Sequence, residues 1–415
     1  MRVRVPGARC EMIEPAGLPP GRRIQHCRER AGMSRRVLGG LIDRSAEWVK
    51  AVETGRLQTP RLNMLLRIAR ALGVDDLAVL TGDDQAVPVQ VFTSEPHAAL
   101  AAVRAALTGY QVTPAGTAPS VDHLGIRLEQ AWAVRHSSPD HRTQLGAVLP
   151  GLIGDAQRAV RLHTDARGAR RLLARVYQLT DFYVAYQPAP ELVWLVADRA
   201  MREARDADDP YLIGGSAWAL VQALRDAGRW DEAMTVAHDG AGLLGPRLDH
   251  APDDWRAMWG ALQFEMGYVL ARRGRAGEAW AYWDRADHAA ERLPLGYRHV
   301  QTSFGRAVMR AHAVTVNVEL RQPGEALRAA ESFDPDTIAS VPRRSRHLVE
   351  VARAHHQRHD PLATLALLDK AQRTAPETVS YNTYARSMAL ELAHTPPAGF
   401  RTEARDLAAR IGVLS

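Results

Sequence analysis

One helical pattern recurs along most of this chain. Each copy consists of a turn, a short polar step and a small residue that opens a second helix. The copies begin at Gly228, Gly274, Arg321 and His359. Equivalent points lie about 38 to 47 residues apart, a spacing typical of repeats built from two helices. From residue 121 onward the sequence reads as helix after helix, with hardly a strand-like run. This pattern predicts an all-α chain whose larger part is an α-solenoid, in which each helical hairpin packs against its neighbours.

The repeats resemble tetratricopeptide repeats with lengthened helices. In the clearest copy, the large, small, large, turn, small, aromatic and small positions of that family are occupied by Met266, Gly267, Leu270, Gly274, Ala279, Trp283 and Ala286. The resemblance implies a concave face formed by the first helix of each hairpin. Mapped onto this chain, it places on or near that face Phe182, Tyr186, Trp218, Gln222, Arg225, Tyr268, Arg272, Arg353 and His356.

A second pattern precedes the repeats, in residues 21–82. Five short helix-like runs follow one another, and Ser34 and Ser45 stand where N-caps of the second and third runs are needed. Only a few residues separate these two runs, which is typical of a helix-turn-helix. From Arg22 to Gly82 there are twelve Lys or Arg against six Asp or Glu, so this block carries the whole formal excess of +6. A basic block beside a near-neutral remainder indicates contact with nucleic acid.

The same residues resemble the phage repressor/Cro type of helix-turn-helix, the XRE family, without a gap from Ile24 to about Leu80. The matching stretches are "GMS" before the second helix, "S-x-x-x-V-x-x-V-E-x-G" through the third and "LLRIARALGV" after it. In that family an arginine of the first helix pairs with the glutamate that ends the third. The resemblance therefore implies an ion pair between Arg28 and Glu53, which we interpret as a structural latch. Asp43 departs from the family, because glycine is usual at this left-handed turn position.

The third helix is expected to enter the major groove of DNA with its N-terminal residues nearest the bases. Glu47 suits a cytosine amino group and Ala46 a thymine methyl, whereas arginines at the start of the second helix suit phosphates. Trp48 either contacts a sugar of the DNA or covers the junction of the third and fourth helices. We favour the second role, packing within the domain. The predicted DNA-binding residues are Arg35, Arg36, Ser45, Ala46, Glu47, Lys50, Ala51, Arg56 and Arg61.

Regulators that join such a domain to tetratricopeptide repeats, the RRNPP group, often sense peptides and hold the peptide backbone with asparagines. Asn382 is the better placed asparagine of the repeats, since Asn317 falls between helices in the repeat mapping. Aromatic and guanidinium side chains in a groove suit a ligand with an acidic group. The alternative for each residue is ordinary hairpin packing or a solvated position. The predicted ligand-binding residues are Trp218, Gln222, Arg225, Tyr268, Arg272, Arg353, His356 and Asn382.

Other function classes lack their signatures. Cys10 and Cys27 are too few for a disulfide framework or a multi-cysteine zinc site. There is no apolar run of about 18 residues and no apolar core of a secretion signal near the start, so we expect a cytoplasmic protein without membrane contact. Phosphate-loop, dinucleotide, zinc-protease and serine-hydrolase motifs are missing. His355 and His359 have the spacing of two metal ligands but lack a third. We therefore expect no enzyme activity, cofactor or metal.

The predicted organisation has four parts. Residues 1–20 form a flexible arm, 21–82 the helix-turn-helix domain, 83–120 a linker with one helix, and 121–415 the repeat domain. We expect a homodimer that binds an inverted-repeat operator in double-stranded DNA, because one such module makes few base contacts. A peptide or small molecule in the repeats would modulate this binding. The alternatives are an interaction scaffold whose repeats bind a regulatory protein, and a constitutive DNA-binding repressor whose repeats only dimerise.

Overall fold

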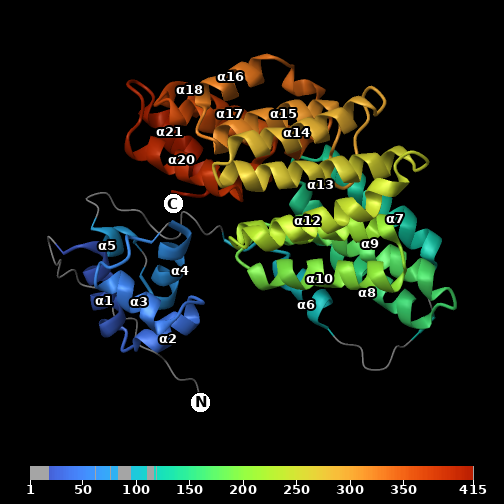
Figure 1. Ribbon diagram of the computed structural model, residues 1–415, viewed down its shortest axis with the longest axis horizontal. Helices are drawn as coiled ribbons and strands as arrows, with labels where there is room; N and C mark the ends of the chain where they lie inside the picture. Colours follow the sequence, from blue (N-terminus) through green and yellow to red (C-terminus); the bar gives the residue numbers. More distant parts are fainter. Residues whose placement is uncertain are drawn as a thin grey trace. The chain divides into compact units, whose positions relative to one another are not determined.

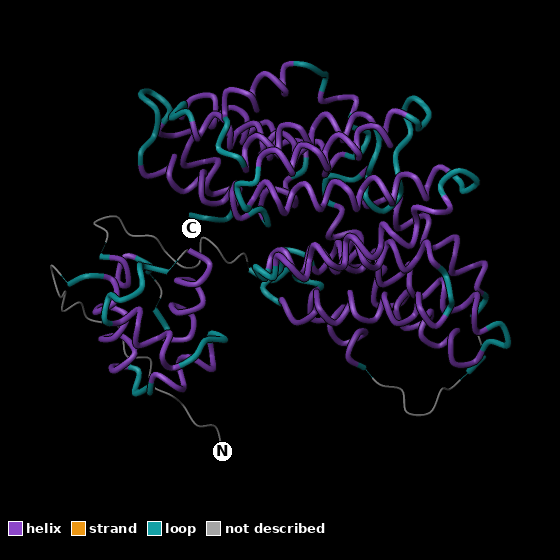
Figure 2. The backbone as a smooth tube through the Cα atoms, viewed as in Figure 1, coloured by secondary structure: helices purple, strands orange, loops and turns teal. Residues whose placement is uncertain are grey.

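The computed structural model of this chain describes residues 18–60, 62–74, 76–82, 95–109, 116–117 and 119–414, apart from the side chains of residues 62 and 63. The chain forms two compact units, Met1–Thr93 and Ser94–Ser415. All the regular secondary structure in the described ranges is helical (Figures 1 and 2). The all-α fold predicted from the sequence, with an N-terminal helix-turn-helix and a body of helical repeats, is confirmed.

The first unit contains five helices around one small core. They are α1 (Pro20–Arg30), α2 (Arg35–Leu41), α3 (Ala46–Glu53), α4 (Leu62–Leu72) and α5 (Ala78–Thr81). The apolar residues of each helix meet in a cluster that includes Ile24, Leu38, Ile42, Val49, Val52, Leu65, Ile68 and Leu80. The hydroxyls of Ser34 and Ser45 accept hydrogen bonds from the backbone N–H groups of Val37 and Trp48, and so cap α2 and α3.

The turn between α2 and α3 is tight because two residues permit it. Asp43 has a φ of 56°, a left-handed conformation that Asp tolerates better than most residues. A Cβ on Gly39 would lie 2.5 Å from the backbone oxygen of Arg44, so only glycine lets the chain turn back this closely. Nothing lies within 4 Å of a Cβ built on Gly40, so the structure gives no reason for that glycine.

The second unit is a series of antiparallel helical hairpins (Figure 1). It begins with α6 (Leu100–Thr108), α7 (Val121–Ser137), α8 (His141–Leu162), α9 (Ala166–Val184), α10 (Pro190–Asp206), α11 (Pro210–Asp226), α12 (Trp230–Leu244), α13 (Asp253–Arg272) and α14 (Ala276–Glu291). It continues with α15 (Arg306–Glu319), α16 (Pro323–Glu331), α17 (Val341–Gln357), α18 (Pro361–Thr374), α19 (Pro376–Ser380), α20 (Thr383–His394) and α21 (Arg401–Ile411).

Four of the hairpin turns have the same backbone geometry. Gly228, Gly274, Arg321 and His359 have φ values of 75°, 75°, 60° and 57°. In each turn, the N–H of the following residue donates to a carbonyl five positions back, as Arg229 does to Leu224. This is the Schellman arrangement, which ends a helix through one left-handed residue. The turns predicted at these four residues are therefore present, although two of them lack the glycine that this conformation favours.

Hairpins far apart in the sequence meet across the inner side of this unit. α7 packs against α17, and His136 lies within hydrogen-bonding distance of the Ser340 hydroxyl, 204 positions later. The other ring nitrogen of His136 faces the carbonyl oxygen of Val300 at 2.6 Å. Burial lowers the pKa of His136 to about 3, so its ring is neutral and can accept one of these bonds while donating the other. The first helices of successive hairpins consequently surround an interior space.

Candidate functional site

The outward face of α3 is small, polar and capped at its start. The side chains of Glu47 and Lys50 are exposed and Ala46 is half-buried. Ser45 is exposed, with its hydroxyl engaged as the N-cap. Ala51, in contrast, is only 3% exposed, so its prediction as a DNA contact is wrong. The chain after α3 turns back here, and the Leu57 N–H donates to the Ala51 carbonyl oxygen.

A buried carboxylate joins the first three helices of this unit. Glu53 has no exposed side-chain surface and accepts from Arg28 Nε at 2.5 Å and from Arg28 Nη2 at 3.2 Å. Arg35 Nε also donates to Glu53, at 2.6 Å. The hydrogen bond to Glu53 raises the pKa of Arg28 above its usual value. Arg35 was expected to bind phosphate. Its Nε is instead bonded to Glu53, so its observed role is to hold α2 against α3.

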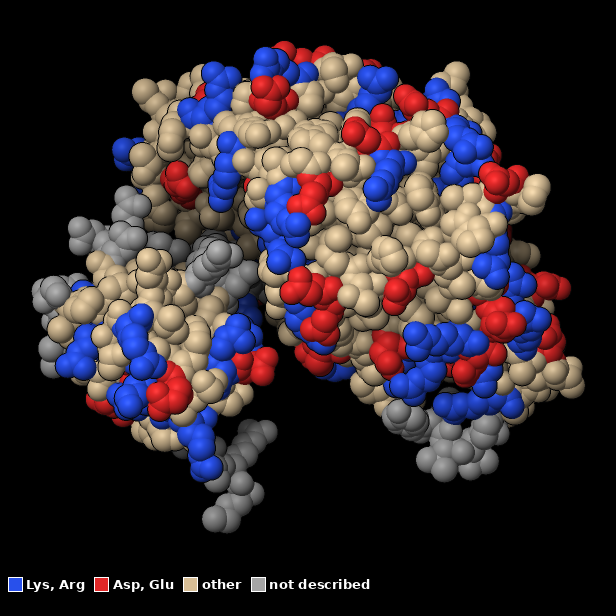
Figure 3. All heavy atoms as spheres, viewed as in Figure 1, with Lys and Arg blue, Asp and Glu red and all other residues tan. Residues whose placement is uncertain are grey.

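The remaining predicted phosphate contacts lie at the surface of the unit. Arg36 and Arg56 are exposed, and Arg56 Nη2 lies 3.9 Å from Glu47 Oε2. Arg61 lies outside the described residues. The prediction missed Arg44, which is exposed in the turn before α3 with its guanidinium 5.8 Å from the Trp48 ring centre. Trp48 itself is half-buried against the core, so packing is its observed role. Figure 3 shows several of the basic side chains on one face of this unit.

A cavity occupies the inner side of the second unit. Its walls come mainly from the first helices of the hairpins, α7, α9, α11, α13, α15 and α17, which is where a concave face was predicted. Aromatic rings form part of the lining. Trp132 meets Phe182 edge-on at 5.5 Å between ring centres, and Phe182 stacks on Trp218 at 5.7 Å. A cavity with an aromatic wall and a few polar groups is typical of a small-ligand site.

Four arginines line this cavity without forming an ion pair with a carboxylate among the described residues. Arg135 comes from α7, Arg142 from α8, and Arg343 and Arg346 from α17. Their partners are neutral. Arg142 donates to the Tyr183 and Ala185 carbonyl oxygens at 2.6 and 3.1 Å, Arg346 donates to the Tyr186 hydroxyl at 2.7 Å, and Arg343 lies 2.9 Å from the His312 ring nitrogens. Sequence reasoning missed all four.

Arg135 has the least compensation of these arginines. Its Nε and Nη1 are buried and have no hydrogen-bond partner in the described part of the chain. Its guanidinium lies 4.9 Å from the centre of the Phe182 ring. Burial, reinforced by the charges of Arg142 and Arg343, lowers the pKa of Arg135 to about 9. The pKa of Arg343 falls to about 10, by burial and by the charge of Arg346. All these groups remain charged at neutral pH, so they repel one another.

Two carboxylates line the cavity, and they differ in environment. Glu265 accepts from Arg225, and this buried pair lies beside Tyr268, whose ring centre is 4.7 Å from the Arg225 guanidinium. Asp181 is 6% exposed, and its Oδ1 has no partner among the residues described. Burial raises the pKa of Asp181 from 3.8 to about 7. Near neutral pH this carboxyl is therefore partly protonated.

The predicted ligand-binding residues divide into two groups. Trp218, Gln222, Arg225, Tyr268 and Asn382 line the cavity. The Asn382 side-chain oxygen also caps α20 by accepting from the Ala385 N–H. The other three do not line it, because each is committed to neighbouring helices. Arg353 pairs with Glu319 and Glu350, His356 lies 2.9 Å from Glu391, and Arg272 lies 5.0 Å from the Trp230 ring centre.

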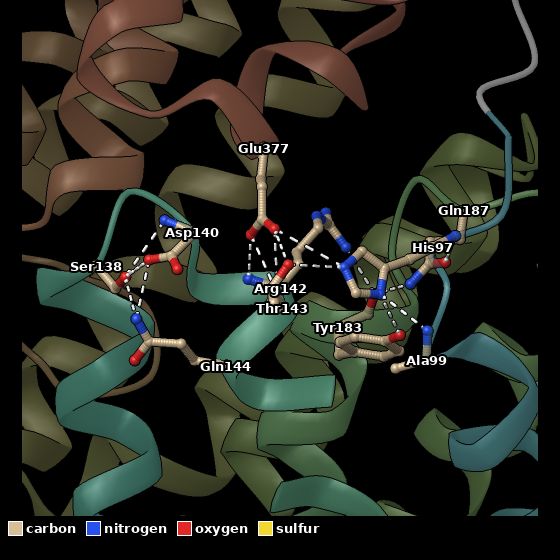
Figure 4. A network of polar contacts seen from close by, with 10 residues as sticks. All are labelled: His97, Ala99, Ser138, Asp140, Arg142, Thr143, Gln144, Tyr183, Gln187 and Glu377. Atoms are coloured by element: carbon tan, nitrogen blue, oxygen red, sulfur yellow. Dashed lines mark hydrogen bonds and ion pairs between the residues drawn. The ribbon is translucent and has the colours of Figure 1, made fainter. Parts of the chain in front are cut away.

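A polar network holds the cavity wall to the start of this unit (Figure 4). Glu377 of α19 accepts from the backbone N–H of Arg142 at 2.5 Å and from the Thr143 hydroxyl at 2.5 Å. A carboxylate at the N-terminus of α8 is favoured by the free N–H groups and the helix dipole. His97 lies between Thr143 and the Tyr183 hydroxyl, at 3.2 and 3.0 Å. Burial lowers the pKa of His97, although Glu377 opposes this.

Comparison with known proteins identifies the first unit. Residues 21–80 match a family model described as a helix-turn-helix domain. These residues are a helix-turn-helix domain. A search of curated proteins finds no match to this chain.

Among solved structures, BtubC from P. vanneervenii is 11% identical, with a TM-score of 0.36, over 64% of this chain and 94% of that chain. PlcR from Bacillus thuringiensis, solved in complex with the peptide PapR7 and DNA, is 11% identical, with a TM-score of 0.33, over 82% of this chain and 97% of that chain.

Two searches of the described residues bear on other classes of function. None of their helices combines the length and apolar character needed to cross a bilayer. They also hold no group of three or more His, Cys, Asp or Glu side chains placed to bind a metal ion. His355, one of the two histidines with metal-ligand spacing, instead lies 3.0 Å from Asp360.

Proposed function

We propose that this protein is a sequence-specific, DNA-binding transcription regulator, dimeric, cytoplasmic and without catalytic activity. The observation that carries the proposal is the helix-turn-helix match over residues 21–80, together with the outward face of α3. On that face Glu47 and Lys50 are exposed at the start and middle of the helix, where base edges are read in this motif. The formal excess of six positive charges in the same block favours DNA phosphates.

The roles within the interface differ. Ala46, Glu47 and Lys50 are proposed to face the bases, whereas Arg36, Arg44 and Arg56 are proposed to hold phosphates, which positions the domain without specifying sequence. Ser45 fixes the start of α3 through its capping hydroxyl. A single domain of this size makes few base contacts, so two copies on an inverted repeat are needed for specific binding.

The second unit is proposed to hold the ligand that modulates DNA binding. The cavity among its first helices supports this role, since it combines aromatic walls with buried polar atoms that lack partners in the described residues. Groups of this kind are costly to bury, and a bound ligand that pairs with them lowers that cost. A peptide or a small molecule is the proposed occupant.

Selection of genomic DNA fragments by the full-length chain, at two salt concentrations, tests the DNA-binding half. The test variant is Arg36→Ala with Lys50→Ala, because both side chains are exposed. Arg35 is left intact, since it pairs with the buried Glu53. The matched control is Arg358→Ala, which removes an exposed arginine from the second unit.

The expected result is an enriched inverted repeat, bound more weakly at the higher salt concentration. The control should retain it and the double variant should lose it. Recovery of random sequence by the wild-type chain, or equal enrichment by the double variant, would refute the proposed interface.

A further inference from the structure

The lining of the cavity has an unbalanced charge. Five arginines and two carboxylates face it among the described residues. Arg225 and Glu265 neutralise each other. Asp181 is partly protonated near neutral pH, because burial raises its pKa to about 7. None of the four arginines contributed by α7, α8 and α17 forms an ion pair with a carboxylate in the described part of the chain.

The arginines that hold helices of this unit together differ in their partners. Some of them have carboxylate partners, as Arg353 has in Glu319 and Glu350. Others, such as Arg199 and Arg306, donate to backbone carbonyl oxygens instead. The guanidinium groups of Arg135 and Arg142 form no ion pair among the described residues, although Arg142 is only 4% exposed, and each has a buried N–H group without a partner there. Buried cations are normally paired, because removing a charge from water costs several kcal/mol. An anion that enters the cavity and pairs with these guanidinium groups therefore lowers the cost of burying them.

Several buried donor atoms that have no partner in the described chain lie in the cavity lining. Nε and Nη1 of Arg135 and Nε of Arg142 are buried, lack hydrogen-bond partners among the described residues, and belong to side chains that line the cavity. Guanidinium N–H groups bind the oxygens of carboxylates and phosphates through charge-assisted hydrogen bonds. The Thr378 hydroxyl, also buried without a described partner, is a further donor in the same lining.

We propose that the cavity binds a small organic anion, whose carboxylate or phosphate group lies against Arg135 and Arg142 and whose apolar part lies against Phe182 and Trp218. This inference rests on the proposed function and names the chemical class of its ligand. The two rings stack on each other, and the Arg135 guanidinium lies 4.9 Å from the centre of the Phe182 ring. The cavity therefore offers both halves of such a ligand adjacent surfaces.

Thermal unfolding of the full chain tests this proposal. Tryptophan fluorescence reports the second unit, which contains eight of the nine tryptophans. The probes are phenylacetate, phenyl phosphate, the neutral phenylacetamide and inorganic phosphate, compared at constant ionic strength and pH. The test variant is Arg135→Gln, which breaks no hydrogen bond of its Nε or Nη1 in the described chain. The control is the exposed Arg358→Gln.

We expect at least one of the two organic anions to raise the melting temperature of the wild-type and control chains by about 3 °C or more near saturation. Phenylacetamide should give less than half of that shift, and so should the organic anion with Arg135→Gln. Without any probe, the Arg135→Gln chain should melt no lower than wild type, because the substitution removes a repelled charge. Phenylacetate and phenyl phosphate distinguish a carboxylate site from a phosphate site.

Three results would overturn the inference. One is a melting-temperature shift that is equal for the two organic anions and phenylacetamide, or no shift with either phenylacetate or phenyl phosphate. Another is an Arg135→Gln chain that responds as wild type does. The third is inorganic phosphate matching both organic anions, which would remove the apolar part of the site. If the probes fail but the chain still recovers an operator, the DNA-binding proposal stands and the anion site is refuted. If the probes raise the melting temperature but the chain binds no specific DNA, only the DNA-binding proposal is refuted.

Discussion

The Arg28–Glu53–Arg35 latch allows a sharp test, because its three members are unequally buried. The side chains of Arg28 and Glu53 are 7% and 0% exposed, whereas that of Arg35 is 36% exposed. Glu53 has two arginine partners. Arg28 also has two carboxylate partners in the described residues, but only Glu53 is buried, because the Glu29 side chain is 56% exposed. Loss of the carboxylate should therefore cost more than loss of Arg28.

The expected magnitudes follow from what each substitution leaves behind. Glu53→Leu leaves the buried charge of Arg28 with only the half-buried Met33 carbonyl oxygen and the exposed Glu29 as its described partners, and should cost about 3–5 kcal/mol. Arg28→Met leaves Glu53 paired with Arg35 and should cost about 1.5–3 kcal/mol, the range for one charged hydrogen bond. The double variant buries apolar groups of similar size, so it should lie close to wild type. In the double variant the Arg35 side chain, which is 36% exposed, can be solvated by water.

Hydrogen exchange of α1 to α3 in the full chain is the appropriate measurement. A whole-chain melting temperature mixes two units and is not a single equilibrium, whereas amide protection reports the opening of each region. The protection of these helices should fall about a hundredfold to a few thousandfold in Glu53→Leu, less in Arg28→Met, and little in the double variant. Equal losses in the two single variants, or a double variant as unprotected as Glu53→Leu, would refute this account of the latch.

Gly39→Ala should destabilise α2, because its Cβ would meet a backbone oxygen at 2.5 Å, whereas Gly40→Ala, in open space, should stabilise it by about 0.5–1 kcal/mol; hydrogen exchange of α2 compares them. His359→Gly should raise the melting temperature of the repeat unit, since a non-glycine residue at φ 57° costs about 1–2 kcal/mol, and Gly274→Ala at φ 75° should lower it, as tryptophan fluorescence of that unit would show. Burial raises the pKa of Asp181 from 3.8 to about 7, so the unfolded state ionises first and this group lowers stability as pH rises through that window, with no further loss above it. Asp181→Asn should abolish that decline in urea titrations measured between pH 4 and 8.

Much of the fold was predictable because local rules dominate helical repeats. Ser34 and Ser45 mark helix starts by supplying a side-chain acceptor, and they cap α2 and α3 as expected. The repeat period also located turns at Arg321 and His359, where no glycine signals a left-handed residue. Spacing was the better guide there, since each hairpin repeats the geometry of its neighbour and tolerates the local strain.

The errors on the DNA-binding face have a tertiary cause. Ala51 lies outside the apolar stripe of Val49 and Val52, so helical periodicity alone places it outward. It is buried because the chain beyond α3 folds back, with the Leu57 N–H bonded to the Ala51 carbonyl. Arg35 was placed at a helix N-terminus, where a phosphate is favoured, but a second bond to Glu53 depends on how α2 packs on α3. Neither contact has a signal in the local sequence.

The cavity shows a different limit of sequence reasoning. The repeat mapping identified which helix of each hairpin faces inward, and Trp218, Gln222 and Tyr268 accordingly line the cavity. It also selected Arg225 and Arg353, yet both are paired with glutamates of neighbouring helices. In a solenoid each hairpin contacts its neighbours, and a small rotation per repeat decides which distant hairpins meet.

That accumulated rotation brings α7 to α17, and with them the arginines that lack carboxylates. In the sequence, Arg135 and Arg343 are ordinary members of helices in which arginine is the commonest cation, and nothing local distinguishes them from Arg353. Their distinction is a missing partner, which only the assembled unit reveals. Neither α7 nor α17 supplies a carboxylate that pairs with these arginines, and the place where the two helices meet is therefore a site for an anion. With a glutamate partner, as Arg353 has, the same arginines would form an ordinary contact between helices.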